Sequence, residues 1–163
     1  KVNPPLRSNR ERTELLSRWD RIDVVASDHA PHTPHEKKLS FSDAPSGVPG
    51  VETALPLLLA AVLENRFSLP DVIAKTSSNP AAILGIPPAG FAPGCRADFA
   101  LFKKEAVRIE ADNLHSRCGW TPFEGMMGVF PAQVIMDGTV VYKEGEFFRT
   151  SPSWIPGKGY FPR

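Results

Sequence analysis

Residues 24–32 read VVASDHAPH, an apolar run that stops at a carboxylate and continues into a turn stiffened by Pro31. The stretch from Ile22 to Ser27 is mostly apolar and β-branched, which predicts a buried strand. In parallel α/β folds the carboxyl ends of strands carry the catalytic groups, because the loops there converge. Asp28 is therefore a candidate metal ligand or proton carrier, with His32 nearby. An aspartate that caps the next turn, with a surface histidine, is the structural alternative.

Sequence signals for helices and a loop lie on both sides of this expected strand. Residues 8–11 read SNRE, a capping-box pattern that predicts the start of a short helix. A polar loop follows from residue 28 to residue 49, and loops this long are uncommon unless they are functional. A helix is expected from Val51 to about Asn65, and shorter ones begin at Ser68 and Asn79. The order of strand, loop and helix predicts an α/β layer fold.

The signals change to β structure beyond Pro87. Residues 97–102 alternate in the manner of a strand, and residues 134–142 hold Asp137-Gly138 between two apolar runs. An Asp-Gly pair in that setting is the best short-range signal for a two-residue hairpin. We therefore expect a boundary within residues 86–93.

Composition excludes several classes of partner. Lysine and arginine number 19 against 18 for aspartate and glutamate, so the net charge is +1. This balance gives no electrostatic reason to expect nucleic acid or an anionic membrane as the partner. No apolar run reaches the roughly 18 residues that a membrane helix needs. Cys95 and Cys118 lack a CxxC spacing, so we expect buried free thiols and a cytoplasmic location.

The longer stretch that begins at Ser27 is more specific than spacing alone. It reads SDHAPHT at 27–33, EK at 36–37, PGVET at 49–53 and LPLLL at 55–59. Together these residues resemble the end of the catalytic barrel of dihydroorotases, members of the metal-dependent amidohydrolase superfamily. KVNPPLR at 1–7 is similar to the motif that precedes it in the bacterial and archaeal type I enzymes. NPA at 79–81, RAD at 96–98 and WTPFEG at 120–125 are similar to later landmarks of the family.

The resemblance implies a fold, a reaction and roles for five residues. Asp28 matches the aspartate that ligates the more buried metal and acts as general base and acid. Asn3 and His32 match groups that bind the carboxylate of dihydroorotate, and Ser46 and Gly47 fall where main-chain groups hold the ring amide. The implied activity is the reversible cyclisation of N-carbamoyl-L-aspartate to L-dihydroorotate in pyrimidine biosynthesis. A divalent metal, expected to be one or two Zn²⁺ per full-length subunit, would lower the pKa of bound water towards about 7.

The implied fold is the C-terminal part of a TIM-type (β/α)8 barrel in residues 1–88, followed by a small β-rich sandwich tail in residues 89–163. A complete barrel takes about 250 residues, and the chain begins at Lys1, so we expect a piece of a longer or processed protein. The sequence holds no His-x-His pair, and one ligand cannot build a catalytic zinc site. The fragment alone is therefore predicted to be inactive. Its expected partners are the missing N-terminal part, further copies or aspartate transcarbamoylase.

Other residues receive structural interpretations. We expect His29 to orient or pack, Glu36 and Lys37 to pair with each other, His115 to lie on the surface, and Trp120 to pack where the tail returns to the barrel. Two other functions stay open. Another cyclic amidohydrolase, an allantoinase or hydantoinase, is disfavoured by His32 and by the PGVET stretch. A non-catalytic homologue that serves as a partner of aspartate transcarbamoylase is disfavoured by the retained Asp28.

Overall fold

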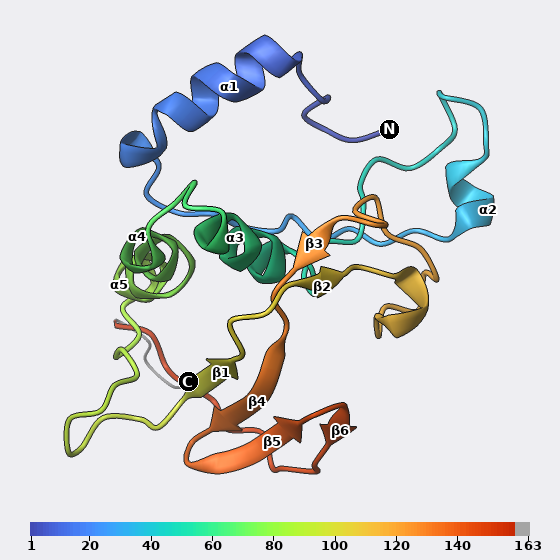
Figure 1. Cartoon of the computed structure of the whole chain (residues 1–163). Coiled ribbons are helices and arrows are strands. Elements are labelled where there is room, and N and C mark those ends of the chain that lie inside the picture. The colour runs from blue at the N-terminus through green and yellow to red at the C-terminus, as the bar shows by residue number, and fades with distance from the viewer. Residues whose placement is uncertain (159–163) are drawn as a thin grey trace.

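The computed structural model describes residues 1–158, so the last five residues of the predicted 89–163 tail lie outside the described part. Helices occupy the first half of the chain and strands the second, as Figure 1 shows. The helical segments are α1 (Asn9–Ser17), η1 (Trp19–Arg21), α2 (Pro34–Lys37), α3 (Ala54–Leu63), α4 (Leu69–Ile73), the π-helical turn η2 (Ala74–Ser78), α5 (Asn79–Leu84) and η3 (Ala111–Asn113). The strands are β1 (Phe99–Phe102), β2 (Val107–Arg108), β3 (Met127–Gly128), β4 (Pro131–Met136), β5 (Thr139–Lys143) and β6 (Glu146–Phe147).

Helix starts follow the local sequence signals. Ser8 accepts a hydrogen bond from the backbone of Glu11 while the Glu11 side chain returns to Ser8, so the predicted capping box at α1 is confirmed. Ser68 caps α4 through the N–H of Asp71. Helix α5 begins at Asn79, also as predicted, and ends at Leu84 with Gly85 as its left-handed C-cap.

The predicted strand at residues 22–27 is wrong as a paired strand. This segment is extended but has no strand beside it in the described part of the chain. Its backbone instead meets the helical region: the N–H of Val25 donates to the carbonyl of Lys75 at 3.0 Å, and the side-chain amide of Asn79 donates to the carbonyl of Asp23 at 2.8 Å. A strand is defined by its ladder partner, and periodicity in one segment carries no information about that partner.

The second half forms two antiparallel sheets. The larger has the order β1-β4-β5-β6, and β2 pairs with β3 in the smaller one. Asp137 and Gly138 join β4 to β5 with φ of 51° and 76°, the positive values that a two-residue hairpin turn of this type requires. This confirms the predicted hairpin. The smaller sheet lies against α3, where the N–H of Val129 donates to the carbonyl of Pro56 at 3.0 Å.

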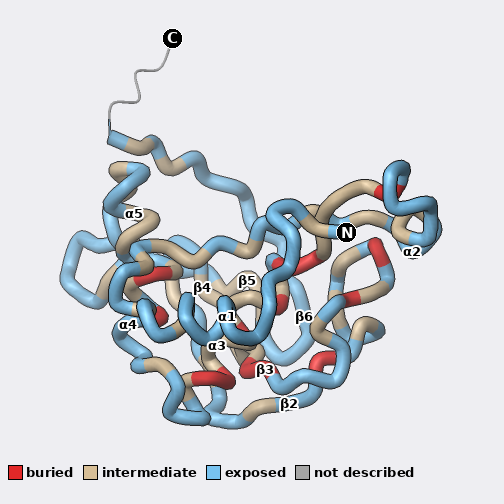
Figure 2. Tube along the Cα trace, turned by 90° about the horizontal axis from the view of Figure 1, so that it is seen from above, coloured by how far each residue is buried: buried red, intermediate tan, exposed pale blue. Residues whose placement is uncertain are grey.

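The chain buries little of its own surface. Its accessible surface is 12061 Å², whereas a compact monomer of its 17.9 kDa mass exposes about 8,000 Å². Figure 2 shows buried residues only in short, separated runs. Several large apolar side chains are exposed, including Leu6 at 89%, Phe91 at 92% and Phe41 at 79%. The chain therefore exposes more apolar surface than a compact monomer of its mass usually does.

The structure tests the predicted burial of the two cysteines and the predicted lack of a membrane helix. Both thiols are free, but only Cys118 is buried, and Cys95 is exposed, so burial was predicted wrongly for Cys95. Cys95 lies in the loop before β1, where local sequence carries no signal for depth. No helix within residues 1–158 has the length and apolar content that a membrane crossing requires.

One ion-paired cluster fixes the start of β1 to the β4–β5 turn. Asp98 accepts hydrogen bonds from Arg96 at 2.9 Å and from the N–H of Asp137 at 2.6 Å. These bonds, first the one from Arg96, hold the pKa of Asp98 below its usual range. A lowered folded-state pKa means that the carboxylate stabilises the fold above the unfolded-state pKa, and that this stabilisation is lost as the pH falls through the folded-state pKa.

We therefore expect Asp98→Asn to lower the thermal midpoint by about 2 °C at pH 7, a modest effect because the pair is partly exposed. The difference from the unchanged chain should shrink as the pH falls towards about 3. Circular dichroism melts at several pH values measure this, with Asp112→Asn in exposed η3 as the control. A difference that grows on acidification would contradict the assignment.

Candidate functional site

Asp28 stands where the extended segment ends and the long loop begins. Its φ is +45°, in the left-handed region that non-glycine residues rarely adopt. The residue is exposed, and within residues 1–158 its carboxylate makes no hydrogen bond or ion pair. A backbone held in this conformation with a free carboxylate at the end of an extended segment is typical of a functional position.

His29 closes the base of the loop. Its Nδ1 accepts hydrogen bonds from the N–H of Gly50 at 3.0 Å and the N–H of Val51 at 3.2 Å. Residue 29 also pairs in parallel with Val48, and the N–H of Ala30 donates to the carbonyl of Val48 at 3.0 Å. Because Nδ1 accepts hydrogen bonds from two N–H groups, this nitrogen carries no proton, and its lone pair is not available to a metal. The predicted orienting role of His29 agrees with these contacts.

The structure brings His32 and Ser46 together. The Nε2 atom of His32 lies 3.1 Å from the carbonyl oxygen of Ser46. A carbonyl can only accept, so Nε2 carries the proton and donates in this pair. The carbonyl of His32 in turn accepts from the indole N–H of Trp120 at 2.7 Å, which brings the later half of the chain to the loop as predicted.

Gly47 lies where no side chain fits. Its φ is +124°, and a Cβ atom added there would stand 2.5 Å from the Cβ of Ala30. Its N–H donates to the carbonyl of Lys1 at 3.1 Å, so the loop meets the first residues of the chain. Asn3 is close in sequence to this contact, but its side chain is exposed and makes no hydrogen bond to another described residue.

Glu36 and Lys37 do not pair with each other, so that prediction is wrong. The Glu36 carboxylate instead accepts a hydrogen bond from the N–H of Thr33, in a second capping box at the start of α2. The hydrogen bonds from Thr33 lower the pKa of Glu36. Lys37 instead donates to three backbone carbonyls, a role that sequence reasoning missed because the acceptors lie 8, 10 and 36 residues away.

A metal centre is not complete in the described residues. Within residues 1–158 no three His, Cys, Asp or Glu side chains are grouped closely enough to hold a metal ion. Asp28 is the one predicted ligand, and a catalytic zinc needs three or more from protein. The residues that the structure describes therefore do not fit a metal on their own.

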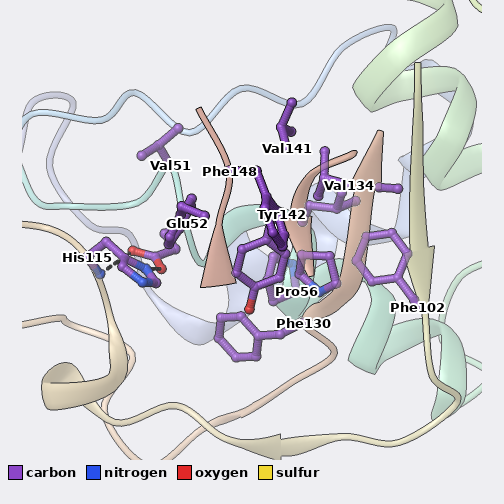
Figure 3. A pocket seen from close by; sticks show the side chains of 14 residues that line it. Val51, Glu52, Pro56, Phe102, His115, Phe130, Val134, Val141, Tyr142 and Phe148 are labelled. Carbon is purple, nitrogen blue, oxygen red and sulfur yellow. Dashed lines mark hydrogen bonds and ion pairs between the residues drawn. The ribbon is translucent and has the colours of Figure 1, made fainter. Parts of the chain in front are cut away.

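A separate apolar cavity of about 510 Å³ lies between α3 and the larger sheet. Figure 3 shows aromatic side chains such as Phe102, Phe130 and Tyr142 around it, with Glu52 and His115 at one end. The ring of His115 lies 2.6 Å from the Glu52 carboxylate, so His115 is exposed as predicted but is not a lone surface group. None of the five predicted site residues lines this cavity.

The chain is similar to dihydroorotases of archaea. It is 51% identical over 146 residues to that of Halobacterium salinarum, a match that covers 87% of this chain and 35% of the relative. The dihydroorotase of Methanosarcina acetivorans is 44% identical over 167 residues, covering 99% of this chain and 35% of the relative. The chain thus spans about a third of the length of the curated relatives it matches. No protein-family model matches it.

Solved structures with a similar fold are hydantoinases. The D-hydantoinase of a Thermus species superposes with a TM-score of 0.83 at 26% identity, covering 90% of this chain and 34% of that one. The L-hydantoinase of Arthrobacter aurescens gives 0.83 at 30% identity, covering 91% and 35%. The arrangement of Figure 1 is therefore part of a larger amidohydrolase fold.

Titration of Zn²⁺ into this chain should show no stoichiometric, tight binding, because three or more protein ligands are needed and the described residues offer one candidate. Isothermal calorimetry measures this, with Asp28→Asn as the matched variant. Tight binding of one Zn²⁺ per chain that disappears in Asp28→Asn would contradict the expectation.

Proposed function

We propose that this chain, which belongs to the dihydroorotase family over the third of the relatives' length that it matches, forms part of an enzyme that interconverts N-carbamoyl-L-aspartate and L-dihydroorotate. The observation that carries this proposal is the 51% identity to a dihydroorotase, set against 26–30% for the hydantoinases of similar fold. We call the longer protein that would contain this chain the parent. An allantoinase or hydantoinase activity is less well supported by these identities.

The proposed architecture divides the chain in two. Residues 1–88 would supply the last strands and helices of a (β/α)8 barrel, and residues 89–163 a β-rich composite segment. The helices within residues 9–84 and the strands within residues 99–147 support this division. So does the extended segment at residues 22–28, whose ladder partners are absent from the described chain. In the parent those partners would be neighbouring barrel strands.

The proposed roles follow from the groups on and beside the loop. Asp28 has an unengaged carboxylate at the end of the extended segment, suited to carry a proton between the attacking oxygen and the leaving nitrogen. Asn3 offers an unengaged amide, and His32 a ring whose Nε2–H points at the Ser46 carbonyl. A substrate carboxylate needs donors, so it would take the Asn3 amide and the Nδ1–H of a protonated His32, whose Nε2–H is donated to Ser46. The backbone at Ser46 and Gly47 would hold the ring amide.

The related enzymes support a metal cofactor for the parent, and we propose one or two Zn²⁺. Such an ion activates water and polarises the scissile carbonyl. Asp28 would be one ligand, and the others would come from the two thirds of the relatives' length that this chain does not span. Because the described residues do not hold a metal on their own, we expect this chain by itself to be inactive.

The apolar surfaces call for a covering partner. The cavity beside α3 is open, with Phe147 64% and Phe148 44% exposed at its edge. We propose that the rest of the parent covers it, rather than another copy or an aspartate transcarbamoylase. Aspartate transcarbamoylase would be the expected partner if the parent were a non-catalytic homologue. The retained Asp28 argues against that alternative function.

The proposed function is tested by dihydroorotate ring opening in the metal-loaded parent. We expect turnover, and a loss of about 10³-fold or more in Asp28→Asn, because a general acid–base group is removed together with a metal ligand. Asp23→Asn, an exposed carboxylate in the same segment, is the control and should retain activity. A folded, metal-loaded parent without turnover would refute the proposal in favour of an allantoinase or scaffold function.

If the rest of the parent covers the apolar cavity beside α3, this chain and its parent should differ in dye binding and in self-association. We expect the chain alone to bind an apolar dye such as ANS and to associate in analytical ultracentrifugation, because its uncovered apolar surface is large. The parent should do neither to the same degree. Phe148→Ser, at the edge of the cavity, should reduce dye binding by the chain. A monomeric chain without dye binding would contradict the proposal.

A further inference from the structure

The ammonium group of Lys37 lies among three backbone carbonyls at the centre of the loop. Nζ donates to the carbonyl oxygens of Lys1, Pro45 and Gly47, each at 2.9 Å. Figures 1 and 2 both show the N-terminal segment beside the loop that follows α2. We propose that Lys37 is a positioning residue that holds the substrate-binding segments of the site in place. This inference rests on the proposed function.

The geometry separates positioning from direct contact. An ammonium group has three N–H donors, and three carbonyls take all of them. No donor is left for a substrate, so Lys37 acts through the segments it binds. A charged donor also makes shorter and stronger bonds to carbonyls than a neutral one does. Lys37 is half-buried, which limits competition from water.

The three acceptors belong to segments that are far apart in the sequence yet carry the predicted binding groups. Lys1 precedes Asn3 by two residues, Pro45 directly precedes Ser46, and Gly47 is itself a predicted contact. One side chain thereby sets the distance between the amide of Asn3 and the backbone of the Ser46–Gly47 turn. Without Lys37, the bond from the N–H of Gly47 to the carbonyl of Lys1 would still join the two segments but would not fix Pro45.

Neighbouring contacts extend this network to His32. The Lys1 carbonyl accepts from the N–H of Gly47 at 3.1 Å as well as from Lys37, and the Ser46 carbonyl lies 3.1 Å from Nε2 of His32. Removal of the ammonium would leave the Pro45 and Gly47 carbonyls without this donor, and the Lys1 carbonyl with the N–H of Gly47 alone, so the turn would be freer to shift. The Ser46 carbonyl, which accepts from Nε2 of His32, would then no longer be held in place, and the His32 ring would be less well oriented.

A role confined to loop stability is the competing explanation. It predicts a lower thermal midpoint with unchanged kinetic constants. A positioning role predicts a raised KM for dihydroorotate, because the groups that bind the substrate move apart, with a smaller change in kcat. The two explanations are therefore separated by the division between KM and kcat.

The experiment uses the metal-loaded parent with Lys37→Met, Lys37→Arg and the control Lys38→Met, which alters an exposed neighbour. We expect Lys37→Met to lower kcat/KM by about 100-fold, chiefly through KM. Lys37→Arg should fall between, because a planar fork keeps the charge but not the three-way geometry. Lys38→Met should stay within about twofold. Folded Lys37→Met with unchanged KM would overturn the proposal.

Two further measurements apply if Lys37→Met does not fold or if the parent shows no turnover. If Lys37→Met does not fold, Lys37→Arg decides, with a raised KM supporting the proposal and an unchanged KM overturning it. If the wild-type parent does not open dihydroorotate, the proposed function fails, and hydrogen exchange tests the positioning. The amides of Ser46 and Gly47 should then exchange at least about tenfold faster in Lys37→Met than in Lys38→Met. Equal exchange would overturn the proposal.

Discussion

The imidazole of His29 joins the two ends of the loop on which the candidate site depends. Its Nδ1 accepts the N–H groups of Gly50 and Val51, so the end of the extended segment is fixed to the turn that leads into α3. The other contacts of the site form within this loop or join it to residues outside it. His32 meets Ser46 there, and Lys37 ties the loop to the N-terminal residues. Asp28, directly before His29, therefore has a fixed backbone and a free carboxylate.

Incomplete burial is the second constraint, and it affects the fold and the site alike. The chain exposes 12061 Å², about half again the surface of a compact protein of its mass. The apolar cavity beside α3 opens to solvent, and the extended segment at residues 22–28 lacks ladder partners in the described chain. The described residues likewise offer one candidate metal ligand where several are needed. Each gap is of the kind that additional chain would fill.

Sequence reasoning succeeded where the determinant is local. The capping box at Ser8 and the hairpin turn at Asp137 depend on residues within a few positions of one another, and both were predicted correctly. It failed where a distant partner decides the outcome. Lys37 was expected to pair with its neighbour but binds carbonyls up to 36 residues away. His115 lies on the surface as expected, but its pairing with Glu52, 63 residues away, was not predicted. No pattern in a single sequence encodes such pairings, since they depend on the packing of separate segments.

A crystal structure of the parent with L-dihydroorotate bound would test the central claim, that residues around the loop closed by His29 form the substrate site. The account predicts the substrate carboxylate within hydrogen-bond distance of Asn3 and His32, with its ring amide on the backbone of residues 46–47. The carboxylate of Asp28 should lie beside the scissile bond. Substrate bound in the apolar cavity beside α3, or anywhere that leaves Asp28 and His32 without contact, would contradict it.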